Sequence, residues 1–118
     1  MEGWLKLYRS LLDWKWYTNS ITKDVFIHCL LKANYEDKKW QGIPVPKGSF
    51  ITSYRHLAEE LGISIQNVRT AINNLELTHE ITHSSTHNLT VIKVENWAKF
   101  QGMVSQANTQ TNTRTNNN

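Results

Sequence analysis

Two stretches in the N-terminal third of the chain have apolar residues at helical spacing. Over residues 4–14, apolar side chains recur at steps of three and four, with Lys6 and Arg9 between them, which predicts an amphipathic helix. A second helix should begin near Thr22, whose hydroxyl can cap it, and run to about Asn34. Apolar residues surround this second helix almost completely, so we expect it at the centre of the core.

Beyond the second helix the pattern changes to short elements. Glycine, proline and charged residues predict an exposed turn and extended chain over residues 35–48, and a short strand follows at residues 49–52. Two β-branched runs, at residues 81–84 and 89–94, are separated by turn-prone residues and predict a β-hairpin. Strands are therefore expected on both sides of residues 53–80.

The middle of the chain predicts two helices joined by a tight turn. Ser53 can cap the first helix, and Gly62 ends it because glycine takes the left-handed conformation without steric cost. Ser64 caps the next helix at once, which we place at Ile65–Leu77. The order strand, helix, turn, helix, hairpin over residues 52–95 is that of a winged helix-turn-helix. The predicted fold is α+β, mostly helical, with additional N-terminal helices.

Length and composition fit a single domain followed by a polar tail. The chain has 118 residues, 39% of them hydrophobic, which is enough for one core. We assign residues 1–101 to this domain and residues 102–118 to a disordered linker, because residues 105–118 are almost wholly small and polar. No apolar run reaches a membrane span and no signal peptide is evident, so we expect a cytoplasmic protein with no membrane partner. The single Cys29 is expected to be a small buried hydrophobe.

The helix at Ile65–Leu77 has two chemically different faces. Val68, Ile72 and Leu75, with Ile65 before them, sit at steps of three and four and should face the core. At about 100° per residue the polar residues fall on the opposite face, with Arg69 on its flank. Those polar residues are Gln66, Asn67, Thr70, Asn73 and Asn74. Asn and Gln can bond adenine bidentately and Arg can bond guanine, so this face has the chemistry of major-groove readout.

Charge limits how strongly such a domain can bind DNA. The net charge is +3 and the pI about 9.1, but residues 47–101 carry as many acidic as basic residues. Lys47, Arg55 and Lys93 are candidates for phosphate contacts, which fix register without reading sequence. About three to five phosphate contacts imply a shallow salt dependence, so one copy should bind double-stranded DNA weakly and several copies more tightly. The full candidate DNA-binding set is Arg55, Ser64, Gln66, Asn67, Arg69, Thr70, Asn73, Asn74 and Lys93.

A zinc-protease pattern, HExxH, occurs at residues 79–83. Its chemistry needs His79 and His83 on one face of a helix, but Ile81, Thr82 and the residues that follow favour strand and turn. In a strand the two histidines would lie about 13 Å apart, too far to share one zinc ion. No other metal, cofactor or catalytic set of residues is recognisable, so we expect neither an enzyme nor a bound cofactor.

Three stretches of the chain resemble a known family. They are WLKLYRSLLDW at residues 4–14, residues 52–75 as described above, and EITHSST at residues 80–86 with VIKVENWAKFQ at residues 91–101. In this order they resemble the N-terminal domains of DnaD-like primosome proteins and of replisome organizers from phages of Gram-positive bacteria. The resemblance implies a winged helix with extra N-terminal helices, self-association through the N-terminal part, and a role in replication initiation that recruits a replicative helicase or its loader. Similar sequences tend to have glycine where this chain has His79.

Two other interpretations compete with a replication protein. A transcription regulator can use the same winged helix on an operator, although such a protein usually carries an effector or dimerisation domain, and the sequence shows no ligand pocket. The fold can also be a protein-interaction or oligomerisation module that does not touch DNA. The balanced charge of residues 47–101 is the best support for this last interpretation.

Overall fold

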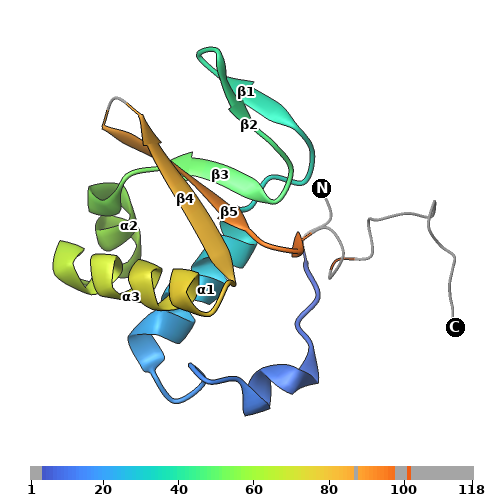
Figure 1. The fold of residues 1–118 in the computed structure, drawn as a ribbon, viewed down its shortest axis with the longest axis vertical. Coiled ribbons are helices and arrows are strands. Elements are labelled where there is room, and N and C mark those ends of the chain that lie inside the picture. The colour runs from blue at the N-terminus through green and yellow to red at the C-terminus, as the bar shows by residue number, and fades with distance from the viewer. Residues whose placement is uncertain (1–3, 87, 98–100, 102–118) are drawn as a thin grey trace, which may run out of the picture.

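The fold is α+β, and the computed structural model describes residues 4–86, 88–97 and 101. In chain order its elements are the 3-10 helix η1 (Arg9–Asp13), α1 (Ser20–Lys32), β1 (Lys38–Trp40), β2 (Ile43–Val45), β3 (Ser49–Thr52), α2 (Tyr54–Leu61), α3 (Ile65–Leu77), β4 (Ile81–Thr86) and β5 (Leu89–Val94). The strands form two antiparallel sheets, β1-β2 and β3-β5-β4. The three α-helices gather on one side of the three-stranded sheet, and the β1–β2 hairpin projects beyond β3 (Figure 1).

The core lies where α3 meets α1 and the three-stranded sheet. The side chains of Val68, Ile72 and Leu75 are fully buried, as the spacing predicted, and Ala71 joins them. They belong to one cluster with residues of α1 and of the sheet, namely Val25, Cys29, Leu30, Ala33, Phe50, Ile81, Ile92 and Val94. The expectation for Ile65 was wrong: it is 38% exposed, because it opens the helix at the edge of this cluster.

Capping residues set the ends of α2 and the start of α3. The Ser53 hydroxyl accepts a hydrogen bond from the His56 amide at 3.1 Å, and the Ser64 hydroxyl accepts one from the Asn67 amide at 2.9 Å. Gly62 ends α2 with a left-handed φ of 70°. Each bond satisfies a backbone N–H that the first helical turn leaves without a partner. The predicted limits of α3 and the three predicted capping roles are confirmed.

The predicted amphipathic helix over residues 4–14 was wrong. Only η1 is helical in this segment, and residues 4–8 before it belong to no helix or strand, with Trp4 66% and Leu12 61% exposed. The backbone of Lys6 instead exchanges two hydrogen bonds with the side chain of Gln101, of 2.8 and 3.1 Å. This distant amide takes the place of the helical hydrogen bonds that the apolar spacing had suggested.

The start of α1 also differs from the prediction. The helix spans Ser20–Lys32, and its N-terminal cap is the side chain of Asn19, which accepts from the Thr22 amide at 3.0 Å. The Thr22 side chain is buried and its hydroxyl accepts a hydrogen bond from the Asn74 amide nitrogen at 3.0 Å. Thr22 therefore joins α1 to α3 and does not cap its own helix.

The β1–β2 hairpin was not predicted, since residues 35–48 were expected to be a turn followed by extended chain. Its two-residue turn has positive φ at Gln41 (47°) and Gly42 (82°), as a type I′ turn requires. Trp40 pairs with Ile43 across this turn. The glycine between two short runs that can form strands was the available indication of a hairpin. The predicted hairpin at residues 81–94 is confirmed as β4 and β5.

The predicted linker at residues 102–118 lies outside the described residues. Among the helices of residues 4–86 and 88–97, none is long and apolar enough to cross a membrane.

Burial makes Cys29 a reporter of folding. Its side chain is fully buried in α1, and burial raises the pKa of its thiol to about 12. Because the thiolate is the reactive form, we expect a disulfide-exchange reagent to modify Cys29 in native protein more than a hundredfold more slowly than in urea-unfolded protein. A stopped-flow comparison of the two rates checks this, and similar rates would contradict a buried thiol.

Candidate nucleic-acid interface

The outward face of α3 carries a continuous stripe of polar side chains. Gln66, Arg69, Thr70 and Asn73 are all exposed and follow the i, i+3, i+4, i+7 spacing that places residues on one helix face. The stripe extends about 10 Å along the helix axis, comparable to about three base pairs of duplex. Its side chains offer amides, a hydroxyl and a guanidinium. The structure therefore brings these four predicted residues together on one accessible surface.

The orientation of Arg69 is set by an aromatic neighbour. Its guanidinium lies 5.4 Å from the ring centroid of Tyr54, at the start of α2. Burial raises the pKa of the Tyr54 hydroxyl, the negative charge of Glu76 raises it further, and the charge of Arg69 lowers it. Tyr54 therefore stays neutral near pH 7 and presents a ring face to Arg69.

The one carboxylate of α3, Glu76, follows Arg69 by seven residues and lies on the same flank of the helix. Glu76 Oε2 lies 2.6 Å from His83 Nδ1 in β4, and His83 Nε2 lies 3.5 Å from the Tyr54 hydroxyl. His83 thus connects β4 with both helices. The Glu76 side chain is only partly exposed, and its hydrogen bond to His83 directs the carboxylate toward β4.

Asn74 does not belong to the outward face, and that expectation was wrong. Its side chain is half-buried and donates to the Thr22 hydroxyl of α1 at 3.0 Å. Asn73, one residue earlier, is exposed. The two amides are about 100° apart around the helix, which is enough to place one against α1 and the other in solvent.

Three other candidates lie at the border of the stripe. Ser64 is exposed, but its hydroxyl already caps α3, and Asn67 is half-buried in the first turn. Arg55 is exposed in the first turn of α2. Of these three, only Arg55 is positively charged, and it lies on α2.

Lys93 lies on a different surface from α3. In β5 the residues Thr90, Ile92 and Val94 are buried, and Ile92 and Val94 pack in the core with the helices. Because side chains alternate along a strand, the exposed Lys93 points from the other face of the sheet. The structure therefore does not bring Lys93 together with the α3 stripe.

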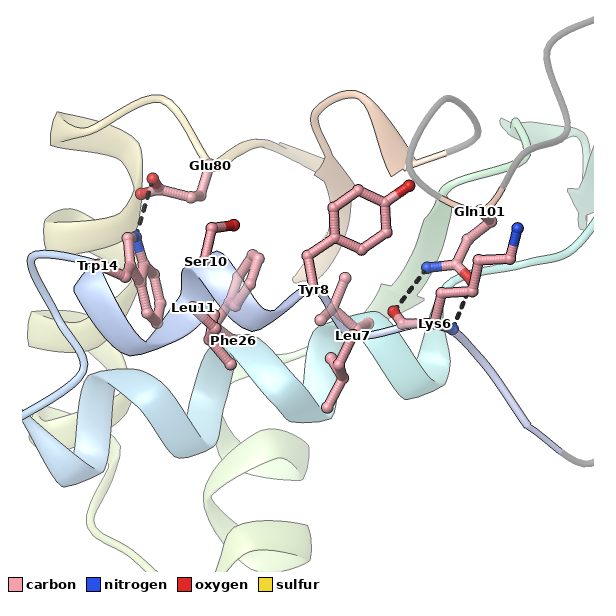
Figure 2. Close-up of a pocket in the computed structure, with 10 residues that line it drawn as sticks. Lys6, Leu7, Tyr8, Ser10, Leu11, Trp14, Phe26, Glu80 and Gln101 are labelled. Atoms are coloured by element: carbon pink, nitrogen blue, oxygen red, sulfur yellow. Dashed lines mark hydrogen bonds between the residues drawn. The ribbon is translucent and has the colours of Figure 1, made fainter.

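Two indole N–H groups hold the N-terminal segment against the end of α3. Trp16 Nε1 donates to the Thr78 hydroxyl at 2.8 Å. Trp14 Nε1 donates to Glu80 Oε2 at 3.0 Å, a bond that Figure 2 shows. The Thr78 hydroxyl also hydrogen-bonds to Glu80. Between them His79 has a left-handed φ of 68°, the conformation expected at this position. We call these two indole hydrogen bonds, Trp14–Glu80 and Trp16–Thr78, the clamp. Sequence analysis missed it, because no local pattern relates Trp14 and Trp16 to residues more than sixty positions away.

The HExxH stretch is not helical. α3 ends at Leu77 and β4 begins at Ile81, so His79 lies in the turn and His83 in the strand, as predicted. In the part of the chain that the structure describes, no three His, Cys, Asp or Glu side chains are placed to hold a metal ion. His83 is occupied by Glu76 and Tyr54.

The clamp predicts a specific loss of stability. Replacing Trp16 by Phe keeps an aromatic ring but removes the hydrogen bond to Thr78, which should cost about 1 kcal/mol and lower the melting temperature by about 4–8 °C. Trp4→Phe is the matched control, because Trp4 is 66% exposed and makes no such bond. Thermal unfolding followed by circular dichroism distinguishes the two. Equal melting temperatures for Trp16→Phe and wild type would show that the clamp contributes nothing.

Comparison with known proteins leaves the interface to be judged on these residues alone. No protein-family model, curated protein or solved structure matches the chain.

Proposed function

We propose that residues 52–95 form a winged helix-turn-helix that binds double-stranded DNA, with α3 in the major groove and the β4–β5 hairpin as the wing. The element order supports this, since α2, a tight turn, α3 and an antiparallel hairpin follow one another. The observation that carries the proposal is the exposed stripe of Gln66, Arg69, Thr70 and Asn73, which offers amides, a hydroxyl and a guanidinium. Helices that are merely solvated are usually rich in Glu and Lys on this face.

Each member of the stripe has a partner among base edges. Gln66 and Asn73 can accept and donate to adenine, and Arg69 can donate two bonds to guanine O6 and N7. Thr70 offers a hydroxyl for a base or phosphate and a methyl group for thymine. Tyr54 holds the arginine side chain partly in place, which lowers the entropy lost when it binds.

Affinity of one copy should be modest. Residues 47–101 carry equal numbers of acidic and basic residues, and Lys93 does not lie with the stripe. Arg55 and Arg69 are the two cations nearest the proposed groove contact, so few phosphates are neutralised. Sequence readout by amides, with several copies acting together, fits this surface better than strong general attraction to DNA.

The biological role we propose is that of a replisome organizer acting in replication initiation. This role rests on the resemblance to DnaD-like proteins, which also makes a replicative helicase or its loader the proposed protein partner. Exposed apolar residues near the N-terminus support self-association: Trp4, Leu7 and Leu12 are 66%, 52% and 61% exposed. A groove of about 200 Å³ lies beside them, between the N-terminal segment and α1 (Figure 2).

Removing the stripe should weaken duplex binding. For Arg69→Ala/Thr70→Ala/Asn73→Ala we expect at least about a tenfold loss of affinity for a fluorescein-labelled duplex of mixed sequence, because contacts to base edges and phosphates are lost. Anisotropy titrations at several salt concentrations measure this. Arg9→Ala/Thr18→Ala is the control, since both residues are exposed and lie outside the α3 stripe.

The outcome separates the two classes of function. If the triple variant folds and binds duplex as wild type does at every salt concentration, the α3 stripe is not a DNA contact. The protein-interaction interpretation, which the exposed apolar N-terminal residues favour, would then replace it.

Self-association should depend on the N-terminal apolar residues. Trp4→Ser/Leu12→Ser removes two exposed apolar side chains and should lower the average mass measured by light scattering at high protein concentration. Leu31→Ser on α1 is the matched control, because Leu31 is 57% exposed and lies outside this segment. A wild-type chain that remains monomeric throughout the concentration series would contradict the proposed assembly.

A further inference from the structure

The β1–β2 hairpin encloses a second hollow, away from α3. Its volume is about 250 Å³, and its apolar floor is formed by Ile51, which is half-buried, with Val45 and Phe50 almost fully buried beside it. The hollow is smaller than the ~300–1,000 Å³ typical of sites for drug-sized ligands. Its size and its apolar floor suit one flat ring, and the hairpin that covers it projects beyond β3 (Figure 1).

Lysines surround this apolar floor. Lys38 and Lys39 line the hollow and are exposed, and neither makes an ion pair with any acid in the described ranges. Lys32 also lines it but is 3.3 Å from Glu60 Oε2. The nearby Asp37 carboxylate accepts a hydrogen bond from the Lys47 amide at 2.9 Å. Two unpaired cations therefore remain at the rim.

An indole completes the surface at the end of β1. Trp40 lines the hollow and is 40% exposed, although burying such a ring is normally favourable. It pairs with Ile43 directly across the two-residue turn, so the hairpin fixes its position. Lysines next to an exposed aromatic ring form the surface on which single-stranded nucleic acids bind, with bases stacked on the ring and phosphates at the cations.

Lys93 lies on the Ile51 face of the three-stranded sheet. Ile51 of β3 pairs with Val91 of β5, so these two share one face of the sheet. Lys93 is two residues beyond Val91 and therefore lies on that face as well. Ile51 lines the hollow and Lys93 does not, so Lys93 shares the sheet face of Ile51 without forming part of the hollow.

We propose that the hairpin surface formed by Lys38, Lys39 and Trp40 binds single-stranded nucleic acid, with one base stacked on Trp40 over the apolar floor. A duplex does not fit, because its bases are already stacked on each other and cannot enter a hollow of this size. Residues 32–51 carry four lysines and two acids, so the surface suits a polyanion better than a second copy of this chain, whose net charge is +3. The proposal stands independently of duplex binding by α3.

The aromatic contact is tested with a fluorescein-labelled thymidine oligomer in anisotropy titrations at low salt. Trp40→Ala should weaken binding about 5- to 150-fold, the range seen when one stacking residue is removed. Trp40→Phe should restore most of the affinity, because a ring remains. Trp4→Ala is the matched control, since that indole is also exposed but lies in the N-terminal segment.

The cationic contact is tested by salt dependence. Lys38→Ala/Lys39→Ala should reduce the slope of log affinity against log salt by about 1.4, from about 0.7 for each single-strand phosphate lost. Lys6→Ala/Lys15→Ala, two exposed lysines of the N-terminal segment, should leave the slope unchanged. Repeating the titrations with a uridine oligomer identifies whether DNA or RNA is preferred, and preference for either supports the site.

The α3 triple variant keeps the two proposals apart, because it should retain single-strand binding. The proposed site on the β1–β2 hairpin would be overturned if Trp40→Ala and Lys38→Ala/Lys39→Ala both bind the single strand with wild-type affinity. Circular dichroism verifies that both variants are folded. The site would also be overturned if Trp40→Ala lowers the average mass measured by light scattering but leaves oligomer binding unchanged. That result would assign the β1–β2 hairpin to contacts between copies of the chain.

Discussion

The burial of one side of α3 against α1 and the sheet determines the rest of this structure. Val68, Ala71, Ile72 and Leu75 have no exposed surface, so the helix cannot rotate without opening cavities in the core. That constraint decides which polar residues reach solvent and which are turned inward. The hydrogen bond from Asn74 to Thr22 lies at the boundary of the buried side. It also prevents α3 from rotating about its axis.

The end of α3 is where separate parts of the chain are joined. Trp14 and Trp16 contact Glu80 and Thr78, and His83 of β4 returns to Glu76 on the helix. The N-terminal segment, α3 and β4 therefore share one polar junction. Any movement of the β4–β5 hairpin relative to α3 must break hydrogen bonds at this junction. We therefore expect the N-terminal segment, α3 and β4 to move as one unit.

Local chemistry explains which parts of the fold could be predicted. Ser53, Gly62 and Ser64 act on amides within their own turns, and their effect on α2 and α3 is visible in the sequence. The segment around Lys6 depends on Gln101, 95 residues away, and apolar spacing alone suggested a helix instead. No local pattern identifies such a partner.

Residues of the candidate site were also predicted correctly only where local periodicity determines their position. Gln66, Arg69, Thr70 and Asn73 were placed correctly because helical periodicity alone separates them from the buried side. Asn74 was misplaced because its partner lies on another helix. Alternation along β5, where Thr90, Ile92 and Val94 are buried, would have excluded Lys93 from the α3 surface.

The paired hydrogen bonds between Lys6 and Gln101 bring the two ends of the described fold to one place on the surface. A short connection between these residues would close the chain into a ring without disturbing its core. New ends could then be opened at an exposed turn such as Gln41–Gly42, which gives a circular permutant with the same contacts. The same geometry allows the fold to be inserted as a unit into a loop of another protein.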